Sequence, residues 1–456
     1  MLYERFLSVI DNSAAQICDI SDYLWDHPET GYAEFLAVDK LCCFLEDNGF
    51  AVTRNLKGIP TAFQACFGTG TPHMGILAEY DGLDGMSQQA DVAEKCPIPG
   101  QEKSHGCGHN LFAAGSVAAA LAVKAYIAET GVGSVTLFGC PAEEGGGGKV
   151  FLARDGAFSD IDAIVSWHPE SMYMVRTRPA LANVKVRYDF EGVASHAGAA
   201  PEKGRSALDA AELMNIGVNF LREHMEPTSR VHYAFLDVGG TAPNMVQSHA
   251  SLFYMIRAID APSVRELHGR VGRIAQGAAM MTDTTVREQV TSGYANLITI
   301  PTLQAVANEA MHDIPVPAPS EQELEFGAKL QQTMTLTETQ RKKGVFADKV
   351  LDPAPPAAHG GSTDTADVSW VCPTVQMHIG TWVVGTPGHS WQSAVQSRGS
   401  YAKKAMLYAG KAVASTILRL METPEKIEQA KAEHREKTAE GYVCALPADA
   451  KPEMVR

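Results

Sequence analysis

SHGCGHN at residues 104–110 leads directly into LFAAGSVAAALAVKAYIAE at residues 111–129, and the rest of the chain is organised around this stretch. The second part is small and apolar at helical spacing, which predicts a buried helix that begins near His109. Cys107 and His109 stand two residues apart between glycines, and glycine permits the sharp turn that lets both side chains reach one metal ion. A helix N-terminus favours negative charge, so we expect it to promote a thiolate at Cys107.

The composition is that of a folded protein of two domains with an acidic balance. Its 456 residues are too many for one ordinary core, and hydrophobic residues make up 45% of them. The net charge of −15 argues against nucleic acid or an anionic membrane as a partner. The nine cysteines are scattered, the N-terminus shows no signal peptide, and no uninterrupted apolar run reaches membrane-spanning length. We therefore expect a cytoplasmic protein.

Apolar segments that alternate with helical ones predict a mixed, mostly parallel sheet flanked by helices. We expect strands at 61–67, 73–78, 134–139, 162–167 and 374–380, and helices at 3–25, 33–48, 301–312, 321–337 and from 399 and 424. Acidic or histidine residues follow the ends of three of these predicted strands: Glu79, the pair Glu143 and Glu144, and His168. In open α/β sheets, ligands bind beyond the carboxyl ends of the strands, so we expect these residues to lie near one site.

The pattern changes over residues 182–295, where polar and apolar residues alternate along the predicted strands. We expect strands at 182–190, 231–238, 250–258 and 284–291, one helix at 206–222, and a second helix that buries Val264, Leu267, Val271 and Ile274. This βαββαβ order is the ferredoxin-like arrangement. We interpret residues 182–295 as a domain inserted into a first domain that consists of residues 1–181 and 296–456.

Five potential metal ligands fall at predicted strand ends or helix starts: Cys107, His109, Glu144, His168 and His389. Thiolate, imidazole and carboxylate donors suit zinc, manganese, cobalt or nickel. Five protein donors are too many for one open catalytic site, but they suit two metal ions that share a ligand. Glu143, beside this ligand set, is placed to act as a general base.

Each of these residues alone has a plainer explanation. Adjacent glutamates in a loop usually form a solvated acidic patch, and a single histidine usually lies at the surface or in the core. The glycine run at 145–148 resembles a phosphate loop but lacks the Gly-Lys-Ser/Thr ending, so we exclude a nucleotide site there. A functional site is favoured by the coincidence of several independent donors at the strand ends of one sheet.

Together these motifs resemble those of the dinuclear metallohydrolase family that includes aminoacylase, carboxypeptidase G and the indole-acetyl-amino-acid hydrolases. Within that family, the chain is similar to the aminobenzoyl-glutamate utilisation branch in five stretches: GCGHN (106–110), GGTAPNMVQ (239–247), GSTDTADVSW (361–370), GTPGHSW (385–391) and the tail YVCALPADAKP (442–452). The resemblance begins at His27-Pro28-Glu29 and extends nearly to the C-terminus.

The resemblance implies a zinc-peptidase-like catalytic domain in which Glu143 is the base and two divalent ions are held by Cys107, His109, Glu144, His168 and His389. It also implies that the inserted domain is a lid through which two copies dimerise, and that His196, in GVASHAG, reaches the partner's active site. Asn244 and Arg257 match residues that hold the substrate's carboxylate. Alternation in the strand at 250–258 places Arg257 on its polar face.

Two departures from the family pattern concern the residues around these ligands. Glu79 and Asp81 stand where the aminoacylase branch has a His and Asp pair, and Asn110 stands where the plant-type motif has Asp. Both changes fit the aminobenzoyl-glutamate branch. They argue against carrying a ligand role over to Glu79, which we leave out of the predicted ligand set.

We expect an amidohydrolase that cleaves the amide bond of an N-acyl or N-aroyl amino acid. The leading substrate is p-aminobenzoyl-glutamate, with indole-acetyl-aspartate and N-acyl dipeptides as alternatives. The expected cofactors are two ions of manganese or zinc, or alternatively of cobalt or nickel. The expected partner is a second copy of the chain, and a second type of subunit stays open. Two other classes also stay open: a cysteine hydrolase with Cys107 as nucleophile and His109 as base, and a non-catalytic metal-binding interaction protein.

Overall fold

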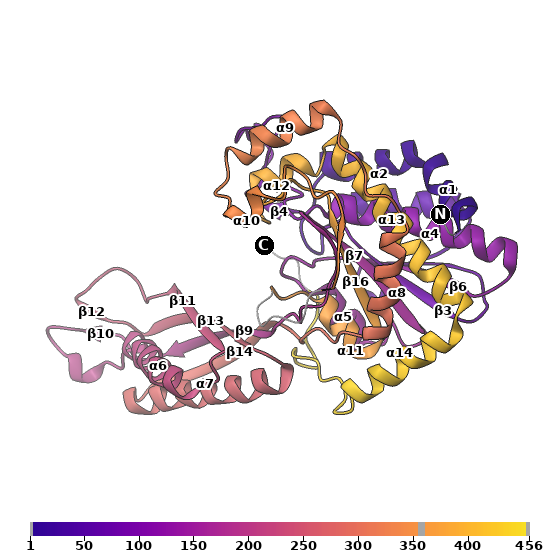
Figure 1. Ribbon diagram of the computed structural model, residues 1–456. Coiled ribbons are helices and arrows are strands. Elements are labelled where there is room, and N and C mark those ends of the chain that lie inside the picture. Colours follow the sequence, from indigo (N-terminus) through magenta and orange to yellow (C-terminus); the bar gives the residue numbers. More distant parts are fainter. Residues whose placement is uncertain (1–2, 354–360, 453–456) are drawn as a thin grey trace.

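A mixed sheet forms the centre of the larger part of the molecule (Figure 1). The computed structural model describes residues 3–353 and 361–452. Within them the sheet has the strand order β1-β2-β6-β3-β7-β16-β8-β15. Its strands are β1 (Ala51–Arg54), β2 (Phe63–Phe67), β3 (His73–Glu79), β6 (Ser134–Cys140), β7 (Ala163–Glu170), β8 (Tyr173–Val175), β15 (Val350–Leu351) and β16 (Thr374–Gly380). The four central strands β6, β3, β7 and β16 are parallel, which confirms the predicted mostly parallel sheet.

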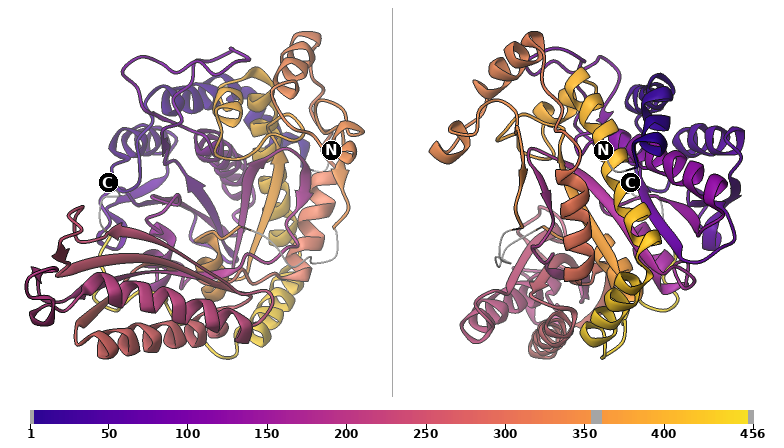
Figure 2. Two further views of the ribbon diagram at one scale, coloured as in Figure 1. Left: turned by 90° about the vertical axis from the view of Figure 1, so that its left-hand side faces the viewer. Right: turned by 45° about the vertical axis from the view of Figure 1, so that its right-hand side comes forward.

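Helices flank this sheet, as Figures 1 and 2 show. The longer ones are α1 (Glu4–Asn12), α2 (Ala14–Asp26), α3 (Phe35–Asp47), α4 (His109–Thr130), α8 (Pro301–His312), α9 (Glu321–Gln331), α13 (Ser400–Glu422) and α14 (Pro424–Lys437). Shorter helices are α5 (Gly148–Arg154), α10 (Glu338–Arg341), α11 (Thr365–Val371) and α12 (Trp391–Gln396). Parallel strands require such crossover connections, because a tight turn can join only antiparallel neighbours.

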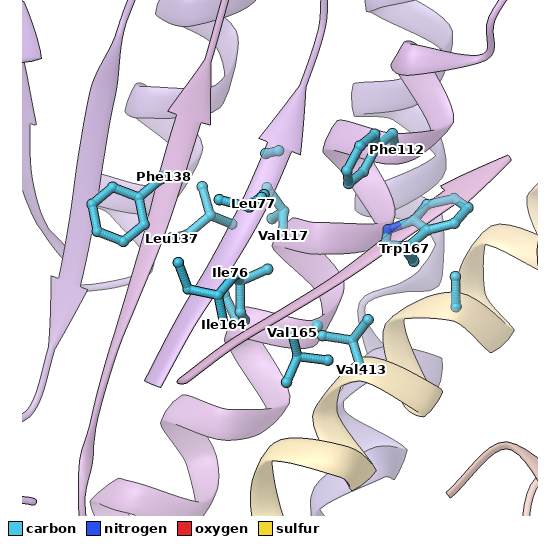
Figure 3. Packing of buried hydrophobic residues seen from close by; sticks show 14 of the residues in the cluster. Ile76, Leu77, Phe112, Val117, Leu137, Phe138, Ile164, Val165, Trp167 and Val413 are labelled. Atoms are coloured by element: carbon cyan, nitrogen blue, oxygen red, sulfur yellow. The ribbon is translucent and has the colours of Figure 1, made fainter. Parts of the chain in front are cut away.

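Helix α4 begins at His109, as predicted, and lies at the centre of the main core. It starts after Gly108 and ends before Gly131, both in the left-handed conformation. Its small residues allow close packing, since a side chain at Gly115 would meet the ring of Trp167 at 2.6 Å. Figure 3 shows Phe112 and Val117 of α4 among Ile76, Leu77, Leu137, Phe138, Ile164, Val165, Trp167 and Val413.

Helix α4 is small and apolar along its length, as predicted for a buried helix. By length and composition alone the helix at His109–Thr130 is able to cross a membrane, but 83% of its most apolar window is buried inside the protein. The expectation concerned an uninterrupted apolar run, and Ser116 and Lys124 interrupt the apolar residues of this helix. Its hydrophobicity is explained by burial against strands β3, β6 and β7.

Some predicted boundaries were wrong, and the reasons are local. The helix expected at 3–25 is two helices separated at Ser13, whose φ of −100° and ψ of 5° depart from helical values. The helix expected at 321–337 ends at Gln331, where the Thr333 hydroxyl donates to the carbonyl of Leu330. Strand β7 runs three residues beyond the predicted 162–167, to Glu170, so His168 lies inside the strand.

Residues 182–294 form a separate four-stranded antiparallel sheet with two helices. The elements are β9 (Ala182–Glu191), α6 (Ala207–Leu221), β11 (Arg230–Asp237), β13 (His249–Ala258), α7 (Ala261–Thr282) and β14 (Thr285–Tyr294), and the strand order is β11-β13-β9-β14. The β-α-β-β-α-β succession is the one that the alternating pattern predicted. Alternate strand residues such as Val186 and Tyr254 pack on the helices in a second core, and the intervening residues lie on the opposite face.

Candidate metal centre

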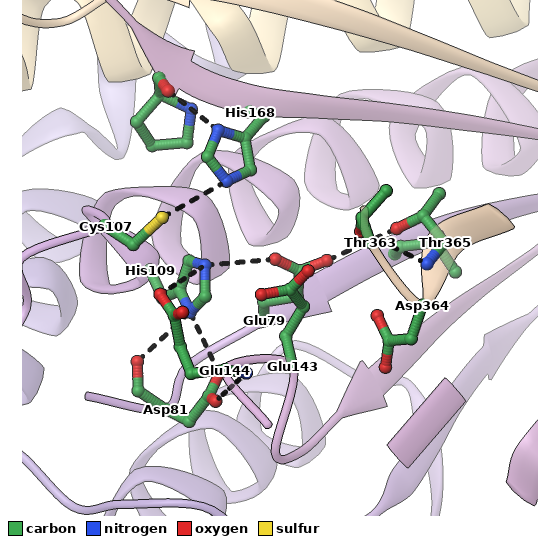
Figure 4. A network of polar contacts seen from close by, with 12 residues as sticks. Glu79, Asp81, Cys107, His109, Glu143, Glu144, His168, Thr363, Asp364 and Thr365 are labelled. Atoms are coloured by element: carbon green, nitrogen blue, oxygen red, sulfur yellow. Dashed lines mark hydrogen bonds and ion pairs between the residues drawn. The ribbon is translucent and has the colours of Figure 1, made fainter. Parts of the chain in front are cut away.

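Polar side chains meet at the carboxyl ends of the central parallel strands (Figure 4). Glu79 ends β3, Glu143 and Glu144 follow β6, and His168 lies near the end of β7. His109 opens α4, and His389 precedes α12. Because the parallel strands end at one edge of the sheet, residues far apart in the sequence are brought together there.

His109 is fixed by carboxylates on both ring nitrogens. Its Nδ1 lies 2.9 Å from Oδ1 of Asp81, and its Nε2 lies 3.2 Å from Oε2 of Glu79. Asp81 also accepts a hydrogen bond of 2.9 Å from the backbone N–H of Glu144 through Oδ2. One carboxylate therefore orients the imidazole and the loop that carries Glu144, a common arrangement behind metal-ligating histidines.

Cys107 and His168 form the second pair. The Sγ of Cys107 lies 3.6 Å from Nε2 of His168, whose Nδ1 lies 2.7 Å from the carbonyl of Pro169. Burial, together with the nearby Glu144 carboxylate, raises the pKa of the Cys107 thiol well above its usual value. In the protein alone, burial therefore opposes the thiolate that the start of α4 is expected to favour.

Glu144 and His389 form the third pair. The Nε2 of His389 lies 3.3 Å from Oε2 of Glu144, and the other carboxylate oxygen lies 4.0 Å from Nε2 of His109. Although burial opposes it, the hydrogen bond from His389 and the charge of His109 lower the pKa of Glu144 to about 2. His389 has a φ of 54°, a left-handed conformation that is uncommon outside glycine and concentrates at functional sites.

The loop that bears Glu143 and Glu144 is held from behind by the N-terminal region. Ala142 has a φ of 56° and donates its backbone N–H to Oε1 of Glu34 at 2.8 Å. The hydroxyl of Tyr32 donates to the carbonyl of Gly146 at 2.8 Å. These contacts bring a segment more than one hundred residues away in the sequence against the loop and fix the direction in which the two glutamates point.

A buried charge network adjoins the cluster. The Nζ of Lys149 lies 2.8 Å from Oε1 of Glu79 and 2.5 Å from Oδ1 of Asp364, and all three side chains are at most 1% exposed. Sequence reasoning missed Lys149 and Asp364 and set Glu79 aside. A signal for Glu79 existed in its place at a strand end, whereas nothing in the local sequence distinguishes Lys149 from a solvated lysine after a glycine run.

The potential ligand atoms lie in groups that are close enough together to bind two metal ions. Ligand atoms lie within 4.8 Å of one another in three groups: Cys107, His109 and His168; Cys107, Glu144 and His389; and Glu79, His109 and Glu143. The first two groups contain all five predicted ligands and share Cys107. Burial, followed by the charges of Glu79 and Glu144, raises the pKa of Glu143 well above its usual value.

A cavity of about 460 Å³ opens onto this cluster and reaches the inserted sheet. Arg257 lines it and donates a hydrogen bond of 3.0 Å to the hydroxyl of Ser362. His196 and Asn244 do not line it, and both are exposed. His196 lies on β10 (Ser195–His196), which pairs with β12 (Met245–Val246) at the end of the inserted layer that projects from the large sheet (Figure 1).

Asn244 therefore cannot add a donor beside Arg257 within one chain. Arg257 lies near the end of the ten-residue strand β13, whereas Asn244 precedes its start. At about 3.3 Å per residue, the two side chains are separated by roughly the full length of the strand.

Comparisons with known proteins place this chain among metallohydrolases. The sequence profile of peptidase family M20/M25/M40 matches residues 76–419. One of the p-aminobenzoyl-glutamate hydrolase subunits of Escherichia coli (strain K12) is 39% identical, with 100% of this chain and 99% of that protein aligned. The Xaa-Arg dipeptidase of Mus musculus is 30% identical over 96% of this chain and 94% of its own length. In structure, a dinuclear metal binding peptidase from Bacillus subtilis covers 91% of this chain and 99% of its own, with a TM-score of 0.60 and 16% identity.

Proposed function

The chain belongs to peptidase family M20/M25/M40 and is a metal-dependent amidohydrolase, and on this premise we propose that it uses two metal ions to cleave the amide bond of an N-acyl or N-aroyl amino acid. The observation that carries the proposal is the convergence of five potential ligands beside Glu143, on one cavity. We propose p-aminobenzoyl-glutamate as the substrate, because a relative aligned over the whole chain is named for its hydrolysis.

Two divalent ions fit the residues present. Within the part of the chain that the structure describes, Oε2 of Glu79, Nε2 of His109 and Oε1 of Glu144 are buried and form no hydrogen bond, although the first two atoms lie 3.2 Å apart. Buried polar atoms without partners are costly, and a cation would satisfy them. The ligands would be Cys107, His109, Glu144, His168 and His389. The donor types suit manganese or zinc, with cobalt and nickel as alternatives. When bound, the ions supply Lewis-acid chemistry that polarises a carbonyl and acidifies water.

Glu143 moves the proton in the proposed reaction. Its carboxylate oxygen lies within 4.8 Å of the ligand atoms of Glu79 and His109 and lines the cavity, where it can reach a water molecule beside the metal ligands. The carboxylate takes a proton from water as the oxygen adds to the amide carbon. It then returns this proton to the leaving nitrogen. The C–N bond breaks, and the products are a carboxylic acid and a free amine.

We propose that the ferredoxin-like insertion at 182–295 is the lid and the dimerisation domain. Strand β11 is an edge strand, and exposed apolar side chains lie on it, directly after it and on helix α6 of the same layer: Tyr233, Phe235, Leu236, Val238, Ile216 and Phe220. An exposed apolar edge of this kind supports pairing with a second copy. His196 and Asn244, which lie outside the cavity of their own chain, would then serve the partner's site, where His196 would stabilise the oxyanion.

Mixed dimers test this arrangement. Glu143→Gln and His196→Ala chains should each be nearly inactive, and subunit exchange between them should restore part of the activity, because one site of each hybrid carries both wild-type residues. A mixture as inactive as its components, in a sample whose exchange is verified by mass, would exclude a role in trans for His196. The word "subunit" in the name of the Escherichia coli relative supports testing a second type of subunit in the same assay.

A dipeptidase is the second candidate function. The Xaa-Arg dipeptidase of Mus musculus also aligns over nearly the whole chain. A hydrolysis panel decides between the two: p-aminobenzoyl-glutamate, indole-acetyl-aspartate, N-acyl dipeptides and an Xaa-Arg dipeptide, each with manganese, cobalt and zinc in turn. We expect p-aminobenzoyl-glutamate to give the highest kcat/KM and chelation to abolish it. Failure of every amide with every metal would overturn the proposal.

A further inference from the structure

Three cationic side chains line the cavity of the metal centre from different elements. Arg176 follows β8, Lys185 lies on β9 and Arg257 on β13. Within residues 3–353 and 361–452, none of the three forms an ion pair with a carboxylate side chain. Lys185 and Arg257 lie on the face of the inserted sheet opposite its helices, as the alternation of buried residues in both strands requires.

Arg176 occupies a different wall from Arg257. It borders both the cavity of the metal centre and an adjoining cavity of about 460 Å³ that also contains Met172, Met174 and His378. Its backbone N–H and its guanidinium both bond Gln376 of β16, the guanidinium through Nη1 to Oε1 at 2.6 Å. Gln376 is itself only 4% exposed, so it holds the guanidinium in one place.

Among the described residues, no anion in direct contact offsets the charge of Arg176. A guanidinium has five N–H donors, and the bond to Gln376 uses one of them on a neutral acceptor. His378, which lines the same cavity, is kept neutral, because burial and the charge of Arg176 lower its pKa well below the usual value. Glu143 and Glu170 line the same cavity but form no ion pair with Arg176, so their charges act on it only at longer range. A substrate carboxylate can meet the guanidinium directly, with two parallel hydrogen bonds.

We infer that Arg176 is a specificity-determining residue that binds a second carboxylate of the substrate, so that the amino-acid half is dicarboxylic. The inference rests on the proposed function, in which Arg257 binds the α-carboxylate. Arg176 then binds the side-chain carboxylate of glutamate or aspartate. A leaving group with an arginine side chain would bring a second guanidinium beside Arg176, which like-charge repulsion disfavours. The substrate class of the dipeptidase relative is thereby disfavoured here.

Three substrates of nearly equal shape test the inference with the metal-loaded protein. They are p-aminobenzoyl-glutamate, p-aminobenzoyl-glutamine, which lacks the side-chain carboxylate, and p-aminobenzoyl-isoglutamine, which lacks the α-carboxylate. Arg176→Gln should lower kcat/KM for the glutamate substrate by about 10- to 100-fold and for the glutamine substrate by less than about 3-fold. Arg257→Lys should give the complementary pattern, with a loss on glutamate that is absent on isoglutamine.

Arg187→Gln is the matched control. Arg187 lies on β9 two residues beyond Lys185, pairs with Asp189 and does not line the cavity, so its loss should leave all three rates unchanged. Thermal unfolding and metal content establish that each variant folds. Arg176→Lys, which keeps the charge, should retain a reduced preference for glutamate if Arg176→Gln fails to fold.

Calorimetric titration with free glutamate and free glutamine separates this inference from the proposed function. Wild type should bind glutamate more tightly, and Arg176→Gln should bind the two alike. Equal losses on the glutamate and glutamine substrates, an unchanged preference in Arg176→Gln, or a wild type that cleaves both amides equally would overturn the role of Arg176 while the proposed function stands. If wild type cleaves no amide, the proposed function fails, and equal binding of the two amino acids would overturn the role of Arg176 as well.

Discussion

Charged side chains are buried at the carboxyl edge of the large sheet, whereas they are mostly exposed in the inserted layer. At the sheet edge the side chains of Lys149, Glu79 and Asp364 are at most 1% exposed, so their charges are compensated by ion pairs with one another and not by water. In the inserted layer the ion pair between Arg205 and Asp283 has side chains that are 40% and 81% exposed. The core of the inserted layer is built from apolar residues of alternating strands and two helices.

The difference separates residues that hold the fold from residues that hold the site. Buried carboxylates at the sheet edge outnumber the buried lysine beside them, which destabilises the protein alone and creates a place for cations. The inserted layer has no comparable cluster among the described residues, and its polar side chains lie on exposed faces or on the cavity wall. Substitutions in the two regions should therefore differ in size and in what they change.

The largest effect is expected for Lys149→Met. It removes the lysine that Glu79 and Asp364 share, which leaves Asp364 without its cationic partner and Glu79 with His109 alone. The free energy of unfolding should fall by about 3–5 kcal/mol, as measured by denaturant unfolding. Asp283→Asn is the control from the inserted layer. Its loss should be at most about 1 kcal/mol, since an exposed pair is weak and Asn tolerates the left-handed conformation of this helix end. If both variants lost a similarly small free energy of unfolding, the proposed difference between the two regions would be wrong.

Glu143→Gln should affect turnover without affecting the fold. Glutamine keeps the size of the side chain but cannot accept the proton, so kcat should fall by at least about 100-fold, equivalent to about 2.7 kcal/mol in the barrier. Metal content, measured by elemental analysis, should stay near that of wild type. Glu144→Gln should instead lower the metal content, since it removes a proposed ligand. Near-normal turnover in Glu143→Gln would exclude Glu143 as the base.

Glu34→Gln should change how stability depends on pH. Burial, followed by the charge of Asp81, raises the pKa of the Glu34 carboxyl to about 8, and Oε2 has no hydrogen-bond partner among the described residues. A raised pKa means that the stabilising contribution is fully present below the ordinary pKa of about 4.5 and is lost as the pH rises through about 8. Glutamine has no proton to lose. Between about pH 6 and about pH 8, wild type should therefore lose about 2 kcal/mol relative to Glu34→Gln in metal-free denaturation experiments. Parallel curves would mean that the carboxyl is already charged.

The smallest effect is expected for Ser206→Ala in the inserted layer. Ser206 caps α6, and its hydroxyl accepts the backbone N–H of Asp209 at 3.0 Å. Loss of the cap should cost about 1 kcal/mol in unfolding free energy, and Ser206→Asp should restore it. Metal content and the binding of free glutamate should not change in either variant. A change in metal content would show that the inserted layer and the sheet edge are coupled more tightly than their separate cores indicate.

Local rules predicted the elements and the chemical types of the site residues. The run of small apolar residues determined α4, whose start at His109 agrees with the prediction. The bounds of α8 and β16 agree as well, and alternation placed Arg257 on the polar face of β13. These features depend on neighbours within a few positions, through the periods of 3.6 and 2 residues, and are therefore visible in the sequence. The donor residues at strand ends and helix starts indicated the proposed ligands and the proposed base, and the family resemblance implied the same set.

The tertiary structure alone decided which residues share one place. The local sequence around a glutamate at a strand end does not reveal its environment. Such a residue can be solvated or can lie 3.2 Å from a histidine, as Glu79 does from His109. Lys149 and Asp364 reach the site because parallel strands and their crossover helices end at one edge, and Glu34 reaches it because the N-terminal region packs against the loop after β6. The separation of Asn244 from Arg257 follows from the length of a single strand, and the approach of Arg176 to the cavity from the pairing of β8 with β16. Distances across elements depend on packing and register over the whole chain, and the free energy of a buried charge depends on those distances, so neither is encoded in any short stretch of residues.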